Sequence, residues 1–261
     1  MRTNKLRVLL RKGEPTLGTR VLIPWSGLVE IIGRTQLYDY FEFVSEYAPY
    51  DLHDLDNLAR ASEIVDISSM IKIDYSSRSY LAGRALAAGI QNILFVDTRT
   101  VQDAEEAERA VRAEPKGMSG YRMDRRCGYV GVTATGADVV KMCDEVVVAL
   151  MIEKKPAVEN LEDILSVEGI DMVQFGPMDY SLSIGLPGEV GHPKVKEAEI
   201  RTIKTALKLD VAPRAEVRNL EEARKYLDLG VRNFSLNTDV KILFDWLREN
   251  GNKMRETISK I

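Results

Sequence analysis

Short apolar segments rich in β-branched residues alternate with amphipathic segments along the chain. The apolar segments have the length of strands, and the amphipathic ones repeat their hydrophobic positions at the spacing of a helix. The expected strands cover residues 18–24, 40–46, 70–74, 92–97, 145–153, 171–175, 212–217 and 231–237. Strands that alternate with helices predict a parallel sheet.

The helices are expected where hydrophobic positions recur three or four residues apart. A short helix over residues 5–12 precedes the first strand, and Asp51 and Gly89 are interpreted as a start and a stop signal. The other expected helices are residues 26–34, 51–64, 78–88, 101–112, 137–143, 157–166, 192–209, 220–229 and 240–261. Two segments, 114–136 and 176–192, are expected to be irregular and rich in glycine.

Eight strand–helix units in 261 residues match a (β/α)8 (TIM) barrel. No Gly-x-Gly-x-x-Gly follows the first strand, which argues against an open dinucleotide-binding sheet. We therefore expect one barrel domain over residues 1–261. Active sites of such barrels lie at the carboxyl ends of the strands.

Composition excludes several classes of protein. Lys+Arg is 36 and Asp+Glu is 40, so the formal charge is −4. A domain that binds nucleic acid is expected to be basic, so this composition argues against that function. No apolar run is long enough to span a membrane, and the charged N-terminal segment does not resemble a signal peptide. With only two cysteines, we expect a cytoplasmic protein. With only two histidines, a His-rich zinc site is excluded.

Two carboxylates stand at the ends of neighbouring expected strands. Glu153 closes an almost wholly apolar strand, so it must be paired, protonated or bound to a cation. Asp179 follows Gly-Pro at the end of the next strand, in a turn expected to point it inward. Completed by water and substrate oxygens, the pair would suit Mg²⁺ or Mn²⁺. The structural alternative is that Glu153 pairs with Lys72 or Lys154 and that Asp179 caps a turn.

Lys72 and Tyr47 are the other candidates for chemistry. Lys72 lies in an apolar strand, on one face with Met70 and Asp74, and would be near Glu153 if that face lines the barrel. It would then orient a substrate carboxylate, form a Schiff base, or act only as an ion-pair partner. Tyr47, at a strand end, would donate a proton or hydrogen bond to substrate, or simply pack.

The histidines and the loop arginines have simpler interpretations. His53 falls in the first turn of a helix and His192 precedes Pro193 at a helix start, so both are interpreted as surface or capping residues. Three arginines of the long loop would either hold an anionic substrate from above or be solvated: Arg122, Arg125 and Arg126.

Several motifs together resemble the HpcH/HpaI family of class II pyruvate aldolases. The most specific is Gly176-Pro177-Met178-Asp179-Tyr180-Ser181, preceded by Val167-Glu168-Gly169-Ile170-Asp171. The resemblance extends over roughly residues 5 to 250. It includes Glu46-Tyr47-Ala48-Pro49-Tyr50-Asp51, Ala88-Gly89-Ile90, Pro115-Lys116-Gly117-Met118-Ser119-Gly120, Gly191-His192-Pro193 and Leu229-Gly230.

This resemblance implies a metal-dependent carbon–carbon lyase that cleaves or forms a 2-oxo acid such as pyruvate, with an aldehyde as partner. The divalent ion, Mg²⁺, Mn²⁺ or Co²⁺, would be held by Glu153 and Asp179. The substrate carboxylate would be held by the segment Gly176, Pro177, Met178 and Asp179, with Lys72 at the enolate oxygen. Family members commonly form hexamers and exchange their last helix, here residues 240–261.

The chain departs from the family pattern at five polar positions. Tyr47 stands where the family has the histidine that acts as base, and Lys72 stands where it has an arginine. Val44, Met151 and Ala87 replace an aspartate, a glutamine and an acid. The metal ligands therefore carry over, while the proton-transfer residues do not. Tyr47 is a poor base near neutrality, since an ordinary tyrosine has a pKa of about 10.

Three hypotheses arise from these departures. The first is the metal-dependent aldolase, with Lys72 and Tyr47 as its catalytic residues. The second is other chemistry, either a Lys72 Schiff base without metal or condensation or decarboxylation of an oxaloacetate-like substrate. The third is a protein that binds a 2-oxo acid without turnover.

Overall fold

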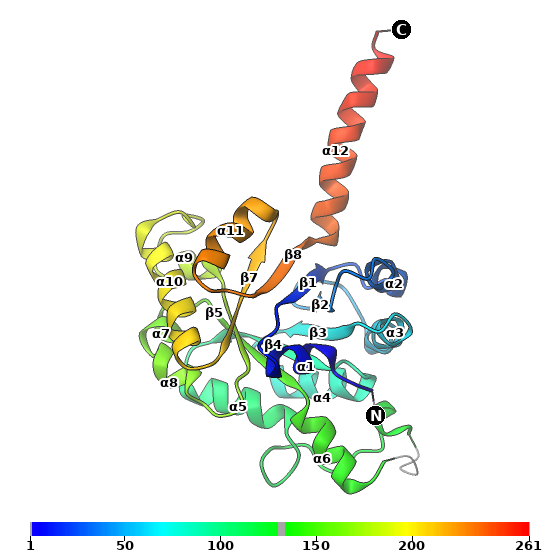
Figure 1. Cartoon of the computed structure of the whole chain (residues 1–261), viewed down its shortest axis with the longest axis vertical. Helices are drawn as coiled ribbons and strands as arrows, with labels where there is room; N and C mark the ends of the chain where they lie inside the picture. Colours follow the sequence, from blue (N-terminus) through cyan, green and yellow to red (C-terminus); the bar gives the residue numbers. More distant parts are fainter. Residues whose placement is uncertain (1, 130–133, 261) are drawn as a thin grey trace.

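Eight strands pair in parallel, each with the next along the chain and the last with the first, so the sheet closes into a barrel (Figure 1). The expected (β/α)8 barrel is thereby confirmed. This computed structural model describes residues 2–129 and 134–260. The strands are β1 (Thr16–Val21), β2 (Tyr40–Val44), β3 (Ser68–Ile73), β4 (Asn92–Thr98), β5 (Val147–Ile152), β6 (Met172–Phe175), β7 (Ala212–Val217) and β8 (Asn233–Thr238).

Helices surround the barrel and connect the strands. Asp51 begins α3 with a capping box, and Gly89 ends α4 at a φ of +106°, as the two sequence signals predict. The helices are α1 (Lys5–Arg11), α2 (Ser26–Arg34), α3 (Leu52–Ile64), α4 (Arg78–Ala88), α5 (Val101–Val111), the 3₁₀ turn η1 (Arg125–Cys127), α6 (Gly136–Asp144), α7 (Lys155–Glu159), α8 (Leu161–Leu165), α9 (Pro177–Ser183), α10 (Pro193–Lys208), α11 (Leu220–Asp228) and α12 (Asp239–Ile258).

Two expectations about helices were wrong. The helix expected over residues 157–166 is two short helices, α7 and α8, because Asn160 leaves helical geometry at φ −108° and ψ 27°. The segment expected to be irregular after residue 176 contains α9. Pro177 is its first residue, where the missing N–H costs nothing and the fixed φ suits a helix. As a result, Asp179 lies in the first turn of a helix.

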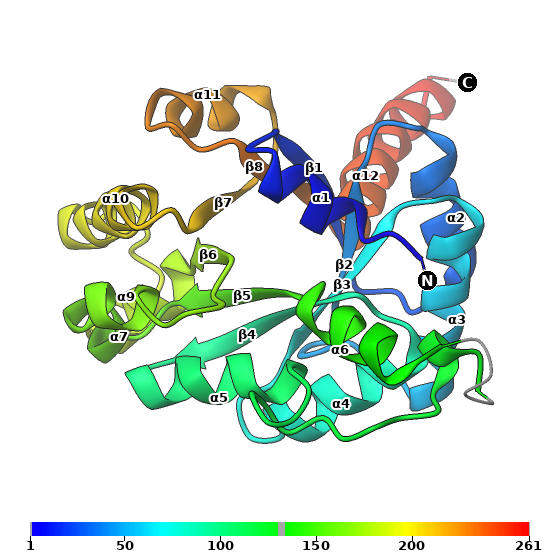
Figure 2. The ribbon, with the colours of Figure 1, turned by 60° about the horizontal axis from the view of Figure 1, so that its bottom comes forward.

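The amino end of the barrel is closed by α1, which lies across it in Figure 2. Leu6 is fully buried and packs into the interior cluster of the barrel with Met70 and Leu94. Asn4, at the start of α1, donates a hydrogen bond of 2.7 Å to Asn92 and accepts one of 3.0 Å from Ser68. The carboxyl end of the barrel is therefore left as the place for a site.

Charged residues line the middle of the barrel. Glu42 of β2 is fully buried and forms an ion pair with Arg214 of β7, which is itself only 3% exposed. Nearer one side, Arg20 pairs with Glu216 at 2.6 Å. These pairs lie inside the barrel because strand alternation turns every second side chain inward.

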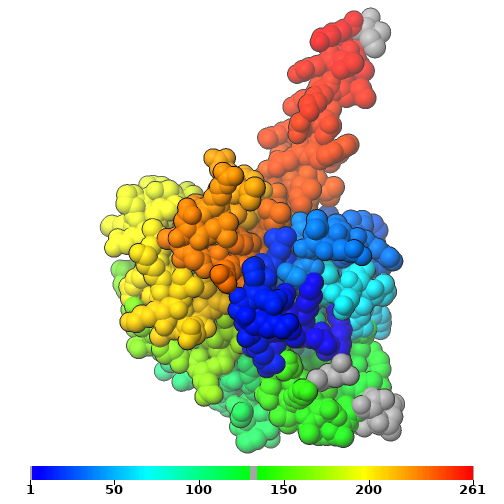
Figure 3. Space-filling view, in the orientation of Figure 1, coloured from blue at the N-terminus to red at the C-terminus, as the bar shows by residue number. Residues whose placement is uncertain are grey.

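The last helix, α12, stands clear of the barrel (Figure 3). Its 20 residues carry large apolar side chains that are half or more exposed, among them Leu243, Phe244, Trp246, Leu247 and Met254. Nothing in the described part of the barrel covers this apolar surface. Over the same residues, no helix is long and apolar enough to cross a membrane.

Candidate active site

Lys72 and its partners form one side of the open end of the barrel. Lys72 points inward from β3 and is 5% exposed, as strand alternation predicts. Its ammonium lies 2.7 Å from Glu46 Oε2 and 3.4 Å from the Tyr47 hydroxyl, both just beyond the end of β2. The hydroxyl and ring of Tyr47 therefore border a fixed, buried cation.

Electrostatics keep this cation protonated. Burial alone lowers the pKa of Lys72, but the hydrogen bond to Glu46 and the charge of Glu46 outweigh it and raise that pKa above its ordinary value. Desolvation raises the pKa of Tyr47, and Glu46 adds to this, while Lys72 opposes it. Near neutral pH the pair thus consists of an ammonium and a neutral phenol, which can donate protons or hydrogen bonds but are poor bases.

Glu153 adds a buried carboxylate to the site, immediately after β5. It is 2% exposed, and its Oε1 accepts a hydrogen bond of 2.9 Å from the backbone N–H of Asp97. Burial raises the pKa of Glu153 to about 7, and the nearby charges of Asp179 and Asp97 contribute, opposed by Lys72 and the Asp97 N–H. Glu153 is therefore a carboxylate whose negative charge is poorly compensated by the protein alone.

Asp179 approaches Glu153 from the first turn of α9, and a lysine holds it. The Nζ atom of Lys154 lies 3.2 Å from Asp179 Oδ1 and 2.8 Å from Asp97 Oδ1. Among the described residues, no Lys, Arg or His nitrogen lies in ion-pair range of Glu153 itself. The sequence alternative that pairs Glu153 with Lys72 or Lys154 was therefore wrong, because Lys72 turns to Glu46 and Lys154 to the two aspartates.

Gly176 makes room for Glu153 at the end of β6. A Cβ atom added at this glycine would lie 2.6 Å from Glu153 Oε2 and 2.7 Å from Glu153 Cβ. Any larger residue would displace the carboxylate. The Gly-Pro-x-Asp motif thus has two physical roles here, since it leaves space for one carboxylate and starts the helix that carries the other.

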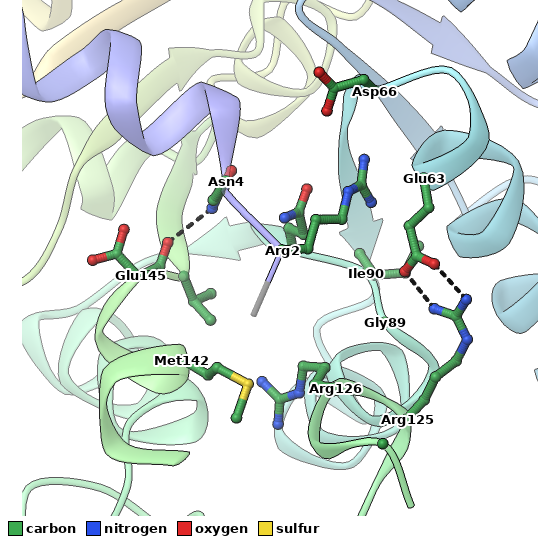
Figure 4. A pocket seen from close by; sticks show the side chains of 13 residues that line it. Arg2, Asn4, Glu63, Asp66, Gly89, Ile90, Arg125, Arg126, Met142 and Glu145 are labelled. Atoms are coloured by element: carbon green, nitrogen blue, oxygen red, sulfur yellow. Dashed lines mark hydrogen bonds and ion pairs between the residues drawn. The ribbon is translucent and has the colours of Figure 1, made fainter. Parts of the chain in front are cut away.

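The arginines of the long loop lie away from this site. Arg125 and Arg126 line a cavity of about 530 Å³ (Figure 4). Ile90 and Val146, which lie just before the first residues of β4 and β5, also line it, as does Asn4. The cavity is therefore at the amino end of the barrel. Arg125 is bound to Glu63 of α3, and Arg122 donates to the carbonyl of Gly83 in α4. The idea that these arginines hold a substrate from above was wrong, because Arg122 and Arg125 attach the loop to helices and Arg126 pairs with Asp124 of the loop itself.

The two histidines have the peripheral positions expected of them. The imidazole of His192 accepts a hydrogen bond of 3.2 Å from Lys194 N and caps α10. His53 lies exposed in the first turn of α3. Neither of them belongs to the site.

Three residues of the site were given no functional role from the sequence: Glu46, Asp97 and Lys154. Of these, Lys154 was considered only as a partner of Glu153. Each is charged and lies within two residues of a strand end or of a predicted ligand. This position is the feature of the sequence that could have pointed to a role in the site. Their roles depend on which opposite charge each side chain reaches, and sequence spacing does not supply that information.

Comparison with known proteins decides the family. A family model described as HpcH/HpaI aldolase/citrate lyase matches residues 44–245, more than half of the chain. The chain belongs to this family. The HpcH/HpaI resemblance inferred from the Gly-Pro-x-Asp motif is thereby confirmed, and the protein is an enzyme of a carbon–carbon lyase family.

Individual relatives extend over nearly the whole chain. A 2-keto-3-deoxy-L-rhamnonate aldolase of Shigella boydii is 31% identical over 88% of this chain and 87% of its own length. A hydroxypyruvate/pyruvate aldolase of Roseobacter denitrificans is 27% identical over 93% of both. An HpcH/HpaI aldolase/citrate lyase family protein of Burkholderia cenocepacia is 26% identical, with a TM-score of 0.88 over 97% of this chain and all of its own.

The aldolases of this family generally depend on a divalent metal, and the site has a donor set suited to one. Glu153 is buried with no cation from the described residues in ion-pair range, and Asp179 presents a second carboxylate beside it. In the described part of the chain, no group of three or more His, Cys, Asp or Glu side chains is arranged to hold a metal. Two carboxylates with open positions suit Mg²⁺ or Mn²⁺, which complete their octahedron with water and substrate oxygens.

Proposed function

We propose that this enzyme cleaves or forms a carbon–carbon bond next to a 2-oxo acid such as pyruvate, with Glu153 and Asp179 as the ligands of a divalent ion. The observation that carries the proposal is the buried carboxylate of Glu153, poorly compensated by the charges around it, next to Asp179 at the open end of the barrel. Mg²⁺, Mn²⁺ and Co²⁺ are the candidates. The ion would supply Lewis acidity that stabilises negative charge on the oxo acid as the bond breaks.

The chain's own residues would bind and orient the substrate. In a helix the first N–H groups have no partner within the helix, so those of Met178 and Asp179 are available to the substrate carboxylate, with Gly176 and Pro177 shaping the turn. Lys72 would place its fixed positive charge toward the oxygen that becomes the enolate. Tyr47 would donate to the aldehyde oxygen, consistent with a neutral phenol at the mouth of the barrel.

The raised pKa of Lys72 argues against a Schiff base. A lysine must lose its proton before it attacks a carbonyl, and enzymes that use this chemistry lower the pKa of the lysine. Glu46 does the opposite here. We therefore propose that Lys72 acts as an ammonium and not as a nucleophile.

The test is a turnover assay with a panel of substrates. We expect pyruvate or hydroxypyruvate to be released from a 2-keto-3-deoxy sugar acid or a 4-hydroxy-2-oxo acid when Mg²⁺, Mn²⁺ or Co²⁺ is added, and the activity to be lost with a chelator. The relatives' names suggest which acids to try first. Turnover that survives chelation, together with borohydride trapping of pyruvate on Lys72, would contradict the metal mechanism.

We further propose that the chain forms a homo-oligomer, a hexamer, in which α12 packs against a neighbouring subunit. The proposal is supported by the apolar side chains that α12 exposes and by the way this helix projects away from its own barrel (Figure 1). Burial of each large apolar side chain is worth about 1.5–3 kcal/mol. We expect the double variant Phe244→Glu and Trp246→Glu to shift the mass measured by light scattering toward the monomer, while the exposed control Asn252→Glu on the same helix keeps the assembly.

A further inference from the structure

The ammonium of Lys154 occupies the position of a counter-ion in the carboxylate cluster. It follows Glu153 directly, its side chain is only 17% exposed, and its Nζ atom joins Asp97 Oδ1 at 2.8 Å and Asp179 Oδ1 at 3.2 Å. Burial lowers the pKa of Lys154, but its hydrogen bonds to the two aspartates outweigh this and raise it. An expected metal ligand is thus already bound to a cation that belongs to the protein.

We propose that Lys154 is a built-in competitor of the divalent ion, which must displace its ammonium from Asp179 Oδ1 before that oxygen can coordinate. This inference rests on the proposed metal site and adds to it a residue that sets the affinity for the ion. An ammonium and a divalent cation cannot share one carboxylate oxygen without strong repulsion, because two positive charges a few ångströms apart in a partly buried site are poorly screened.

Asp97 makes this displacement reversible. When Asp179 turns to the metal, Lys154 keeps its shorter contact with Asp97 and is not left as an unpaired charge. The exchange therefore costs one hydrogen bond and some added repulsion between the two cations. It does not leave an unpaired buried ammonium, which would cost far more free energy. The result is a site that holds its ion weakly and releases it readily.

The experiment measures Mn²⁺ binding by calorimetry, and free Mn²⁺ by electron paramagnetic resonance, in the absence of substrate. We expect Lys154→Met to bind Mn²⁺ at least about tenfold more tightly than the wild-type protein, since it removes a full positive charge near the ion. Lys155→Met is the matched control, because Lys155 is the next residue, is exposed, and lies 3.7 Å from Glu159 and not near the site. Lys154→Arg keeps the charge and is expected to stay close to wild type.

The outcomes separate this inference from the function on which it rests. Equal or weaker Mn²⁺ binding by Lys154→Met than by wild type would overturn the role of Lys154 alone. Absence of Mn²⁺ binding in every variant would overturn both the role of Lys154 and the metal site. If Lys154→Met has an altered circular dichroism spectrum, Lys154→Gln, which keeps a polar contact to Asp97, supplies the same comparison.

Discussion

Replacing Glu153 by glutamine is expected to lower kcat/KM by about 1,000-fold or more. Glutamine keeps an oxygen that can accept the N–H of Asp97, so the local structure should persist. It removes the negative charge that would bind the metal. Loss of metal-assisted charge stabilisation is worth several kcal/mol, and each 1.4 kcal/mol is about tenfold in rate.

The measurement is pyruvate release at saturating Mn²⁺, accompanied by Mn²⁺ binding and a thermal melt. Asp163→Asn is the control, since it removes a carboxylate from an exposed position on α8 and should leave all three readings unchanged. Activity within about tenfold of wild type for Glu153→Gln, a loss too small for a removed metal ligand, would show that Glu153 does not hold a catalytic metal.

Replacing Arg214 by methionine is expected to destabilise the protein by about 3–5 kcal/mol, since it leaves the fully buried carboxylate of Glu42 without its partner. The melting temperature should fall by about 10 °C or more in a chain of this length. The double variant Glu42→Met and Arg214→Met should recover most of the loss, because no charge then remains uncompensated inside the barrel.

The control for this cycle is Arg218→Met, which makes the same substitution in a pair with Glu222 where the arginine is 71% exposed. An exposed ion pair contributes about 0–1 kcal/mol, so its melting temperature should barely change. If Arg214→Met and the double variant are destabilised equally, the coupling between Glu42 and Arg214 is absent and the interpretation fails.

The barrel could be predicted from the sequence because its signals are local. Strand β7 and helices α2 and α4 have the predicted bounds, and the Asp51 and Gly89 signals act through their own backbone geometry. Helix α9 was missed because its seven residues, which start with Pro177, show no amphipathic repeat. Its formation depends on tertiary contacts of the residues after Pro177, and the pattern of hydrophobic residues does not report these contacts.

The positions of the candidate site residues could be predicted, but their pairing could not. The sequence brought Lys72, Tyr47, Glu153 and Asp179 to one end of the barrel, since all follow or lie in strands that point the same way. It could not decide that Lys72 binds Glu46 across the β2–β3 junction while Lys154 turns to Asp97 and Asp179. Those choices depend on distances of a few ångströms between side chains from different strands.

The closure of the amino end by α1 has a consequence for the order in which the products of the proposed reaction would leave. Leu6 and Asn4 fill that end, so in the proposed reaction substrate would enter and both products would leave at the carboxyl end. Of the two halves of a cleaved molecule, the one nearer the solvent has to go before the one bound deeper among the carboxylates. For the proposed cleavage, the shape of the barrel would impose a sequence of departure, with the aldehyde first and the oxo acid second.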